Sequence, residues 1–126
     1  MDLNEKIQVR KLIKMCLKGN TKSQSLLFKQ VYGKMMSVCM RYADDNDEAK
    51  DIFQTGMIKV FSNLDKFNFQ GSFIGWIQRI IVNNAIDYIR QKKNIFESFE
   101  NNTLYEQIEK NQNIENVRFA LLRYSF

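Results

Sequence analysis

Hydrophobic residues recur along this chain at intervals of three and four residues, the spacing that lines one side of an α-helix. The sequence contains no proline and only five glycines, so few positions force a break. No segment sustains the alternation of hydrophobic and polar residues that marks a strand. The pattern predicts helices over about residues 4–18, 20–43, 48–63 and 71–93. We therefore expect an all-α fold, a compact helical bundle of three to four helices.

Each of the first three predicted helices has a hydrophobic side that we expect to form the core. Gly19 should end the first helix, and Asn20 to Ser23 can cap the second. Gly33 lies inside the second helix, where we interpret it as the site of a close helix crossing. The expected core residues are Ile7, Leu12, Ile13, Cys16, Leu17, Leu26, Leu27, Val31, Met35, Val38, Cys39, Tyr42, Phe53, Met57, Val60 and Phe61.

The predicted helix at residues 71–93 has two unlike sides. The broad side is mainly hydrophobic and consists of Phe73, Ile77, Ile80, Ile81, Asn84, Ala85 and Tyr88. The opposite side, which we call the polar stripe, consists of Ser72, Trp76, Arg79, Asn83, Asp87 and Arg90. Since Asn84 falls on the core side, we expect its amide to satisfy a buried backbone group.

The polar stripe differs from an ordinary solvated helix surface, which is mostly lysine and glutamate. An aromatic ring, an amide and two guanidiniums are groups that stack on nucleic-acid bases or hydrogen-bond to them. Lys92 and Lys93 follow at the expected end of the helix, where they suit both the helix dipole and phosphate. An amphipathic helix with a mixed polar side would show the same pattern, so both interpretations stay open.

Two other segments are candidates for binding. On the outer side of the helix at 48–63, Asp51, Gln54 and Thr55 flank Ile58, as in a small protein-docking surface, although one exposed isoleucine is common on any domain. The loop at 64–72 carries Phe67, Phe69 and Gln70, with Ser72 as a helix cap. The two phenylalanines either fold back onto the core or wall a pocket for an unstacked base.

Beyond Lys93 the sequence becomes polar and is interrupted by two consecutive asparagines. We expect one helical domain at 1–93, a linker at 94–103 and a C-terminal helical segment at 104–126. The chain ends three residues after its last hydrophobic pair, which suggests that a further element once followed.

Composition excludes several classes of function. The chain of 126 residues has no histidine, and its two cysteines match no metal-ligand spacing, so we expect no enzyme activity, metal or cofactor. Cys16 and Cys39 are interpreted as reduced core thiols. The sequence shows neither a bilayer-spanning run nor a signal peptide, so a cytoplasmic location is expected.

The net charge of +5 is unevenly distributed. Residues 1–24 carry six lysines and arginines against two acids, and residues 71–93 carry four against one. Five acids and one lysine lie between these zones, at residues 44–51, where they can cap and charge-compensate the start of the third helix. The basic zones favour a polyanion such as DNA, although a modest lysine excess is also common on soluble surfaces.

The sequence resembles a known family. The runs DEAKDIFQTGMIKVFSNLDKF and FQGSFIGWIQRIIVNNAIDYIRQKK are similar to the second conserved region of bacterial extracytoplasmic-function (ECF) sigma factors, and the similarity covers roughly residues 10–93. The family usually has an acid and a phenylalanine where this chain has Thr55 and Met57. It also carries a second DNA-binding domain, to whose beginning the end of this chain is similar.

The resemblance implies an RNA polymerase sigma factor that recognises and melts the promoter −10 element. Implied partners are core RNA polymerase, through the clamp coiled coil of its β′ subunit, the non-template strand of promoter DNA, and an anti-sigma factor. The implied polymerase contacts are Asp51, Gln54, Thr55 and Ile58. The implied DNA contacts are Phe67, Phe69, Gln70, Ser72, Trp76, Arg79, Asn83, Asp87, Arg90, Lys92 and Lys93.

Two other functions remain open from the residues alone. A helical repressor would bind its duplex site without polymerase, but no short helix here is set up as in a compact helix-turn-helix. An interaction protein that binds polymerase or an anti-sigma factor as a decoy would leave the polar stripe unused.

Overall fold

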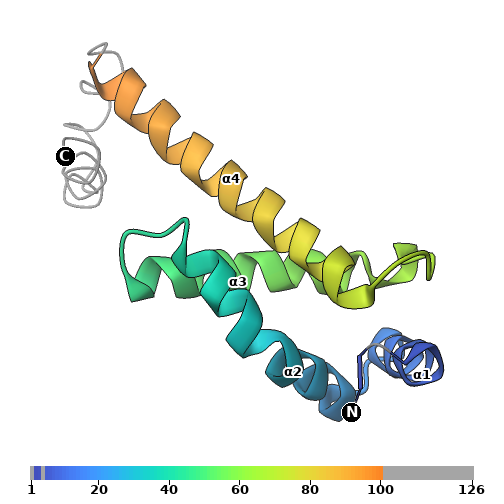
Figure 1. Ribbon diagram of the computed structural model, residues 1–126. Helices are drawn as coiled ribbons and strands as arrows, with labels where there is room; N and C mark the ends of the chain where they lie inside the picture. Colours follow the sequence, from blue (N-terminus) through green and yellow to red (C-terminus); the bar gives the residue numbers. More distant parts are fainter. Residues whose placement is uncertain (1, 4, 101–126) are drawn as a thin grey trace. The chain divides into compact units, whose positions relative to one another are not determined.

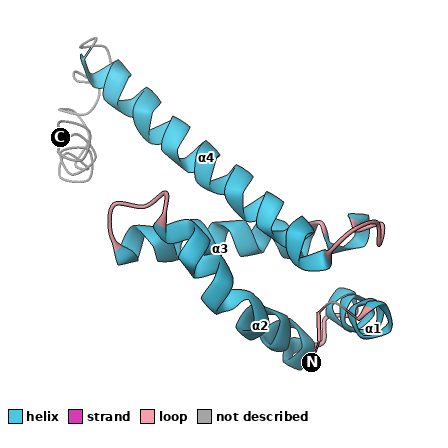
Figure 2. Cartoon of the chain, in the orientation of Figure 1, coloured by secondary structure: helices cyan, strands magenta, loops and turns pink. Residues whose placement is uncertain are grey.

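A computed structural model describes residues 2–3 and 5–100, in which every element of regular secondary structure is helical. The elements are α1 (Lys6–Leu17), α2 (Thr21–Met40), α3 (Asn46–Ser62), the short 3-10 helix η1 (Leu64–Lys66) and α4 (Phe73–Glu100) (Figures 1 and 2). The predicted all-α fold is therefore confirmed. The predicted C-terminal segment at 104–126 lies outside the described residues.

The chain divides into two units, the first comprising Met1–Ala85 and the second beginning at Ile86, within α4. In the first unit α2 and the opening turns of α4 both pack against α3, while α1 packs against α2 and η1. These contacts assemble the core around α3, so α3 holds the elements that carry the candidate sites.

Polar side chains set the helix starts in the way that the sequence predicts. Asn20, Asp45 and Ser72 each accept a hydrogen bond from a backbone N–H in the first turn of α2, α3 and α4, respectively. Gly19 follows α1 with a φ of 84°, a left-handed conformation that suits glycine. The cap of α1 was not predicted: Glu5 accepts hydrogen bonds from two backbone N–H groups at the start of this helix.

Most of the predicted core is buried, but two residues of α1 are not. Ile7 is 75% exposed and Leu17 is 52% exposed, so their assignment to the core was wrong. The buried side of α1 consists instead of Val9, Leu12, Ile13 and Cys16. At about 100° per residue, Ile7 lies on the opposite side of the helix from Cys16, which explains its exposure.

The close helix crossing lies at Gly56 of α3 and not at Gly33. No atom would lie within 4 Å of a Cβ at Gly33, whereas a Cβ at Gly56 would lie 2.7 Å from Cδ1 of Ile81 and 3.4 Å from Nδ2 of Asn84. Gly56 therefore allows α4 to approach the backbone of α3. The expectation for Gly33 was wrong because the side of α2 that carries it faces solvent.

Helix α4 continues to Glu100 and does not end at Lys93 as expected. Residues 94–100 contain no glycine or proline to interrupt it, and Lys93 forms an exposed ion pair with Glu97 one turn later at 4.0 Å. The linker assigned to 94–103 thus begins as helix. The proposed division into domains remains a prediction.

Both cysteines are buried free thiols, as expected. Burial raises the pKa of Cys16, and it raises the pKa of Cys39 to about 11. Both side chains are therefore protonated at neutral pH and act as small hydrophobic residues. Among residues 2–3 and 5–100, no helix combines the length and hydropathy that crossing a bilayer requires.

Because the helices cross at Gly56 and not at Gly33, substitutions at these two glycines should have opposite effects on stability. Gly56→Leu should lower the free energy of unfolding by roughly 1–3 kcal/mol or more, because the added side chain would overlap Ile81, which is fully buried. Gly33→Ala should raise it by up to about 1 kcal/mol, since alanine favours the helix and meets no neighbour. Urea denaturation of both variants measures the difference, and a tolerated leucine at 56 would rule out a tight crossing there.

Candidate nucleic-acid and protein interfaces

The first unit contains the beginning of the polar stripe, on the side of α4 that faces away from α3. Arg79 and Asn83 are exposed and Trp76 is half-buried. The neighbour of Asn83 has the opposite environment: Asn84 is 5% exposed. Its Nδ2 donates hydrogen bonds to the backbone oxygen of Ile52 at 2.9 Å and to Oγ1 of Thr55 at 2.8 Å. The prediction that Asn84 satisfies a buried backbone group is confirmed.

Trp76 belongs to an aromatic cluster that joins α4 to the preceding loop. Its ring centre lies 5.4 Å from that of Phe67 and 6.0 Å from that of Phe73, with which it is nearly parallel. Phe67 also contacts Phe69 and Phe73, with ring centres 4.9 Å and 5.1 Å away. Phe67 is itself only 6% exposed, so the other three rings pack against a buried side chain.

The loop between η1 and α4 turns sharply at two positions. Phe69 and Gly71 have φ angles of 61° and 81°, and the Asn68 side chain accepts a hydrogen bond from the backbone N–H of Gln70. A left-handed conformation is uncommon for phenylalanine and is maintained only where the surroundings stabilise it. Gln70 and Ser72 are exposed beside this turn.

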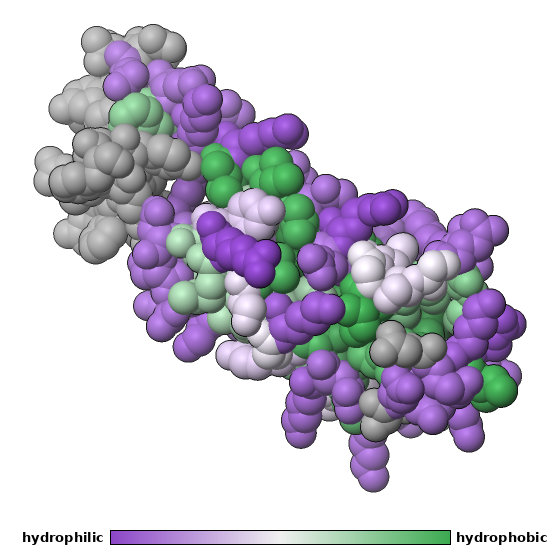
Figure 3. Space-filling view, viewed as in Figure 1, coloured by the Kyte–Doolittle hydropathy of each residue, from purple (hydrophilic) through white to green (hydrophobic). Residues whose placement is uncertain are grey.

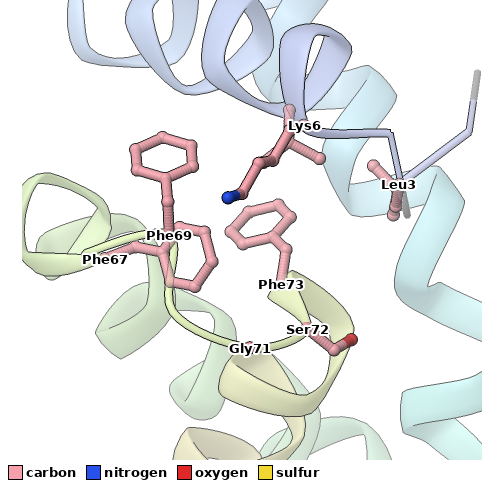
Figure 4. A pocket seen from close by; sticks show the side chains of 8 residues that line it. Leu3, Lys6, Phe67, Phe69, Gly71, Ser72 and Phe73 are labelled. Atoms are coloured by element: carbon pink, nitrogen blue, oxygen red, sulfur yellow. The ribbon is translucent and has the colours of Figure 1, made fainter.

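A cavity of about 220 Å³ opens between this loop and the N-terminal part of the chain. The loop and α4 contribute Phe67, Phe69, Gly71, Ser72 and Phe73, while Leu3, Lys6 and Val9 form the other wall (Figure 4). A pocket walled by the loop phenylalanines was one of the two alternatives that the sequence left open, and the contribution of α1 was not predicted. An indication was present in the sequence, because residues 6–43 contain nine lysines and arginines and no acid.

In the second unit, Asp87, Arg90 and Lys93 are exposed on α4. Lys92 is half-buried, and its Nζ lies 5.1 Å from the ring centre of Tyr88. Lys92 therefore packs against its own helix through a cation–π contact. The side chain of Lys93 is exposed to solvent, and its ion pair with Glu97 is exposed as well.

The candidate docking surface lies on α3. Asp51, Gln54, Thr55 and Ile58 are all exposed, and Ile58 is 65% exposed. The hydroxyl group of Thr55 is engaged within the fold, since it accepts from Asn84 and lies 2.9 Å from the backbone oxygen of Asp51. On the side displayed in Figure 3, hydrophilic residues cover most of the described surface, with hydrophobic atoms visible between them. Ile58, an exposed isoleucine flanked by polar side chains on α3, is a candidate contact for a protein partner.

Comparisons with known proteins agree on one family. The model of the family described as Sigma-70 region 2 matches residues 27–95. The chain is 32% identical over 87 residues to the ECF RNA polymerase sigma factor SigW of Bacillus subtilis, an alignment that covers 69% of this chain and 46% of that protein. It is 31% identical over 87 residues to the ECF RNA polymerase sigma-E factor of Escherichia coli K12, covering 69% and 45%.

The chain spans just under half of the length of these relatives. No solved structure matches the chain significantly.

Asn83 and Asn84 are adjacent in α4, one exposed and one buried, so substitutions at the two positions can be compared directly for their effect on stability. Asn84→Ala should lower the free energy of unfolding by about 1–3 kcal/mol, because it removes two hydrogen bonds between α4 and α3, one buried and one partly buried. Asn83→Ala, on the exposed side, should change it by no more than about 0.5 kcal/mol. Chemical denaturation followed by circular dichroism measures both, and equal losses would contradict the assignment of Asn84 to the helix interface.

Proposed function

Because the chain belongs to the sigma-70 region 2 family and carries the region 2 domain of an ECF sigma factor, we propose that it acts in transcription initiation. It binds core RNA polymerase in the bacterial cytoplasm, then recognises and melts the −10 element of a promoter. The observation that carries this proposal is the cavity walled by Phe69 of the loop and Phe73 of α4, together with the exposed Arg79 and Asn83 further along α4. It performs no catalytic step of its own.

The aromatic cluster suits an unpaired base. A base that leaves the duplex loses its stacking partners, and aromatic side chains restore part of that energy at about 1–3 kcal/mol per base. Trp76 presents a half-buried ring that the neighbouring phenylalanines hold in place. The cavity, at about 220 Å³, is smaller than the roughly 300–1,000 Å³ of sites for drug-sized ligands, which favours a group of the size of one base.

The remaining DNA contacts divide into reading and positioning. The Asn83 amide carries a donor and an acceptor and can pair with a base edge, whereas Arg79, Arg90 and Lys93 can neutralise phosphates. Lys92 is assigned the same role, for which its Nζ would have to leave the Tyr88 ring that it lies over in the structure. Asp87 orients neighbouring side chains, since a carboxylate facing phosphates would be repelled.

Flipping a base out of the duplex costs a few kcal/mol, so capture requires a further source of binding energy. We assign that source to docking on the clamp coiled coil of the β′ subunit through α3. The exposed Ile58 supplies the hydrophobic contact, and Asp51 and Gln54 supply polar contacts around it. Thr55 contributes less in polar terms, because its hydroxyl group already bonds within the fold. An anti-sigma factor would compete for the same surface.

The docking proposal is tested by placing a charge at Ile58. Ile58→Glu should weaken binding to core RNA polymerase by about thirtyfold or more, the effect of losing a central hydrophobic contact. The matched control is Ile7→Glu, which changes an isoleucine on α1 that is at least as exposed as Ile58. Affinity is measured by titrating labelled protein with core polymerase. Wild-type affinity for the Ile58 variant, or an equal loss in the control, would contradict docking through α3.

The strand-capture proposal predicts a preference for unpaired DNA. The chain should bind the single non-template strand of a cognate −10 element more tightly than the same sequence as duplex, because its aromatic groups can reach only unstacked bases. Competition binding with matched oligonucleotides tests this, with the sequence first selected from a random pool. Tighter binding to duplex would favour a repressor, and binding to polymerase without any DNA binding would favour a decoy.

A further inference from the structure

Helix α1 is placed to take part in strand capture, although it precedes the residues that match the family model, 27–95. Its cations Lys6, Arg10, Lys11 and Lys14 are all exposed, and no acid occurs within the helix. One side of it lines the cavity that faces the loop before α4. The cavity therefore has an aromatic wall from the loop, and the wall that α1 contributes carries one cation, Lys6, beside the hydrophobic Val9. An aromatic surface with a nearby cation is the combination that binds single-stranded nucleic acid.

Arg10 contacts the loop directly. Its guanidinium carbon lies 4.5 Å from the ring centre of Phe69, within the range of a cation–π interaction. Phe69 is the residue with the left-handed φ of 61°, so its position depends on neighbours that stabilise it. The Phe67 ring supports it on one side and Arg10 on another. Arg10 thus helps to hold the wall of the cavity.

Lys6 has a different relation to the cavity. In Figure 4 its amine is directed toward the space beside the rings of Phe69 and Phe73, and the residue belongs to the cavity lining. A base inserted between these rings would bring its own backbone phosphate to the edge of the cavity. A lysine amine is a point charge that suits phosphate without reading sequence.

We propose that α1 completes the base-capture site, with Lys6 binding the phosphate of the captured nucleotide and Arg10 acting as a positioning residue for Phe69. The ligand is a single-stranded nucleic acid with at least one unstacked base. This inference rests on the proposed function and adds two contacts from an element outside the family match. The two residues should affect binding differently. Lys6 should contribute to the affinity for every single strand, whereas Arg10 should contribute only where the strand carries a base.

The test compares two single strands with the same number of phosphates, one of mixed sequence and one fully abasic. The proteins are the full chain and its variants Lys6→Gln, Arg10→Gln and Lys11→Gln. The last is the matched control, because Lys11 lies on the same helix but lines a separate groove between α1 and α2. Affinities are measured over a range of salt concentrations, and thermal unfolding by circular dichroism verifies that each variant is folded.

Lys6→Gln should flatten the slope of log affinity against log salt by about 0.7 on both strands, the contribution of one phosphate on single-stranded DNA. Arg10→Gln should lower the ratio of mixed-sequence to abasic affinity roughly two- to fivefold, as expected for an exposed cation–π contact. In a Phe69→Leu background the same Arg10 change should leave the ratio unaltered, because its effect passes through the ring. Lys11→Gln should change neither quantity.

Each contrary result has a distinct meaning. A slope for Lys6→Gln equal to that of Lys11→Gln would overturn the phosphate contact. A ratio that Arg10→Gln leaves intact, or lowers equally without the Phe69 ring, would overturn the positioning role while the proposed function stands. A wild-type ratio of one would show that no base is captured, which would overturn the proposed capture and this inference together.

Discussion

The close approach of α4 to α3 is the constraint on which the other features depend. It requires a residue without a side chain at Gly56, since a Cβ there would overlap Ile81. It also requires a donor at Asn84, which reaches the backbone of Ile52 and the hydroxyl group of Thr55. A buried amide that lost these partners would destabilise the interface by more than the bonds themselves contribute, so the two hydrogen bonds fix the rotation of α4 about its axis. That rotation turns Asn83 and Arg79 outward.

The aromatic cluster extends this arrangement into the loop. Phe73 is buried at the start of α4, and Phe67 connects it to Trp76 and Phe69. Because the rings contact one another, the position of any one of them depends on its neighbours. Arg10 adds a contact from α1, an element distant in sequence. The candidate site is therefore a product of three segments, each of which contributes to the others' geometry.

The residues of the core and those of the candidate binding surfaces are sharply separated along α3 and the first part of α4. Ile52 and Phe53 are buried, whereas Asp51, Gln54 and Ile58 are exposed on the same helix. A change on an exposed side can alter binding without altering the fold. Thr55 is the exception, because its exposed side chain also accepts a hydrogen bond from Asn84. Replacing it would affect both surfaces together.

The sequence by itself determined the helical class, the positions of most helices, the caps at Asn20, Asp45 and Ser72, and the two sides of α4. These features follow from local periodicity and from side chains that bond within one turn, so no distant contact is needed to predict them. The end of α4 was misjudged because a polar run without glycine or proline can continue a helix. Only the tertiary structure decided that Gly56 and not Gly33 is the crossing point, and that α1 borders the cavity. Each of these depends on which side of one helix meets another, and the periodicity of a single helix specifies a hydrophobic side without specifying its partner.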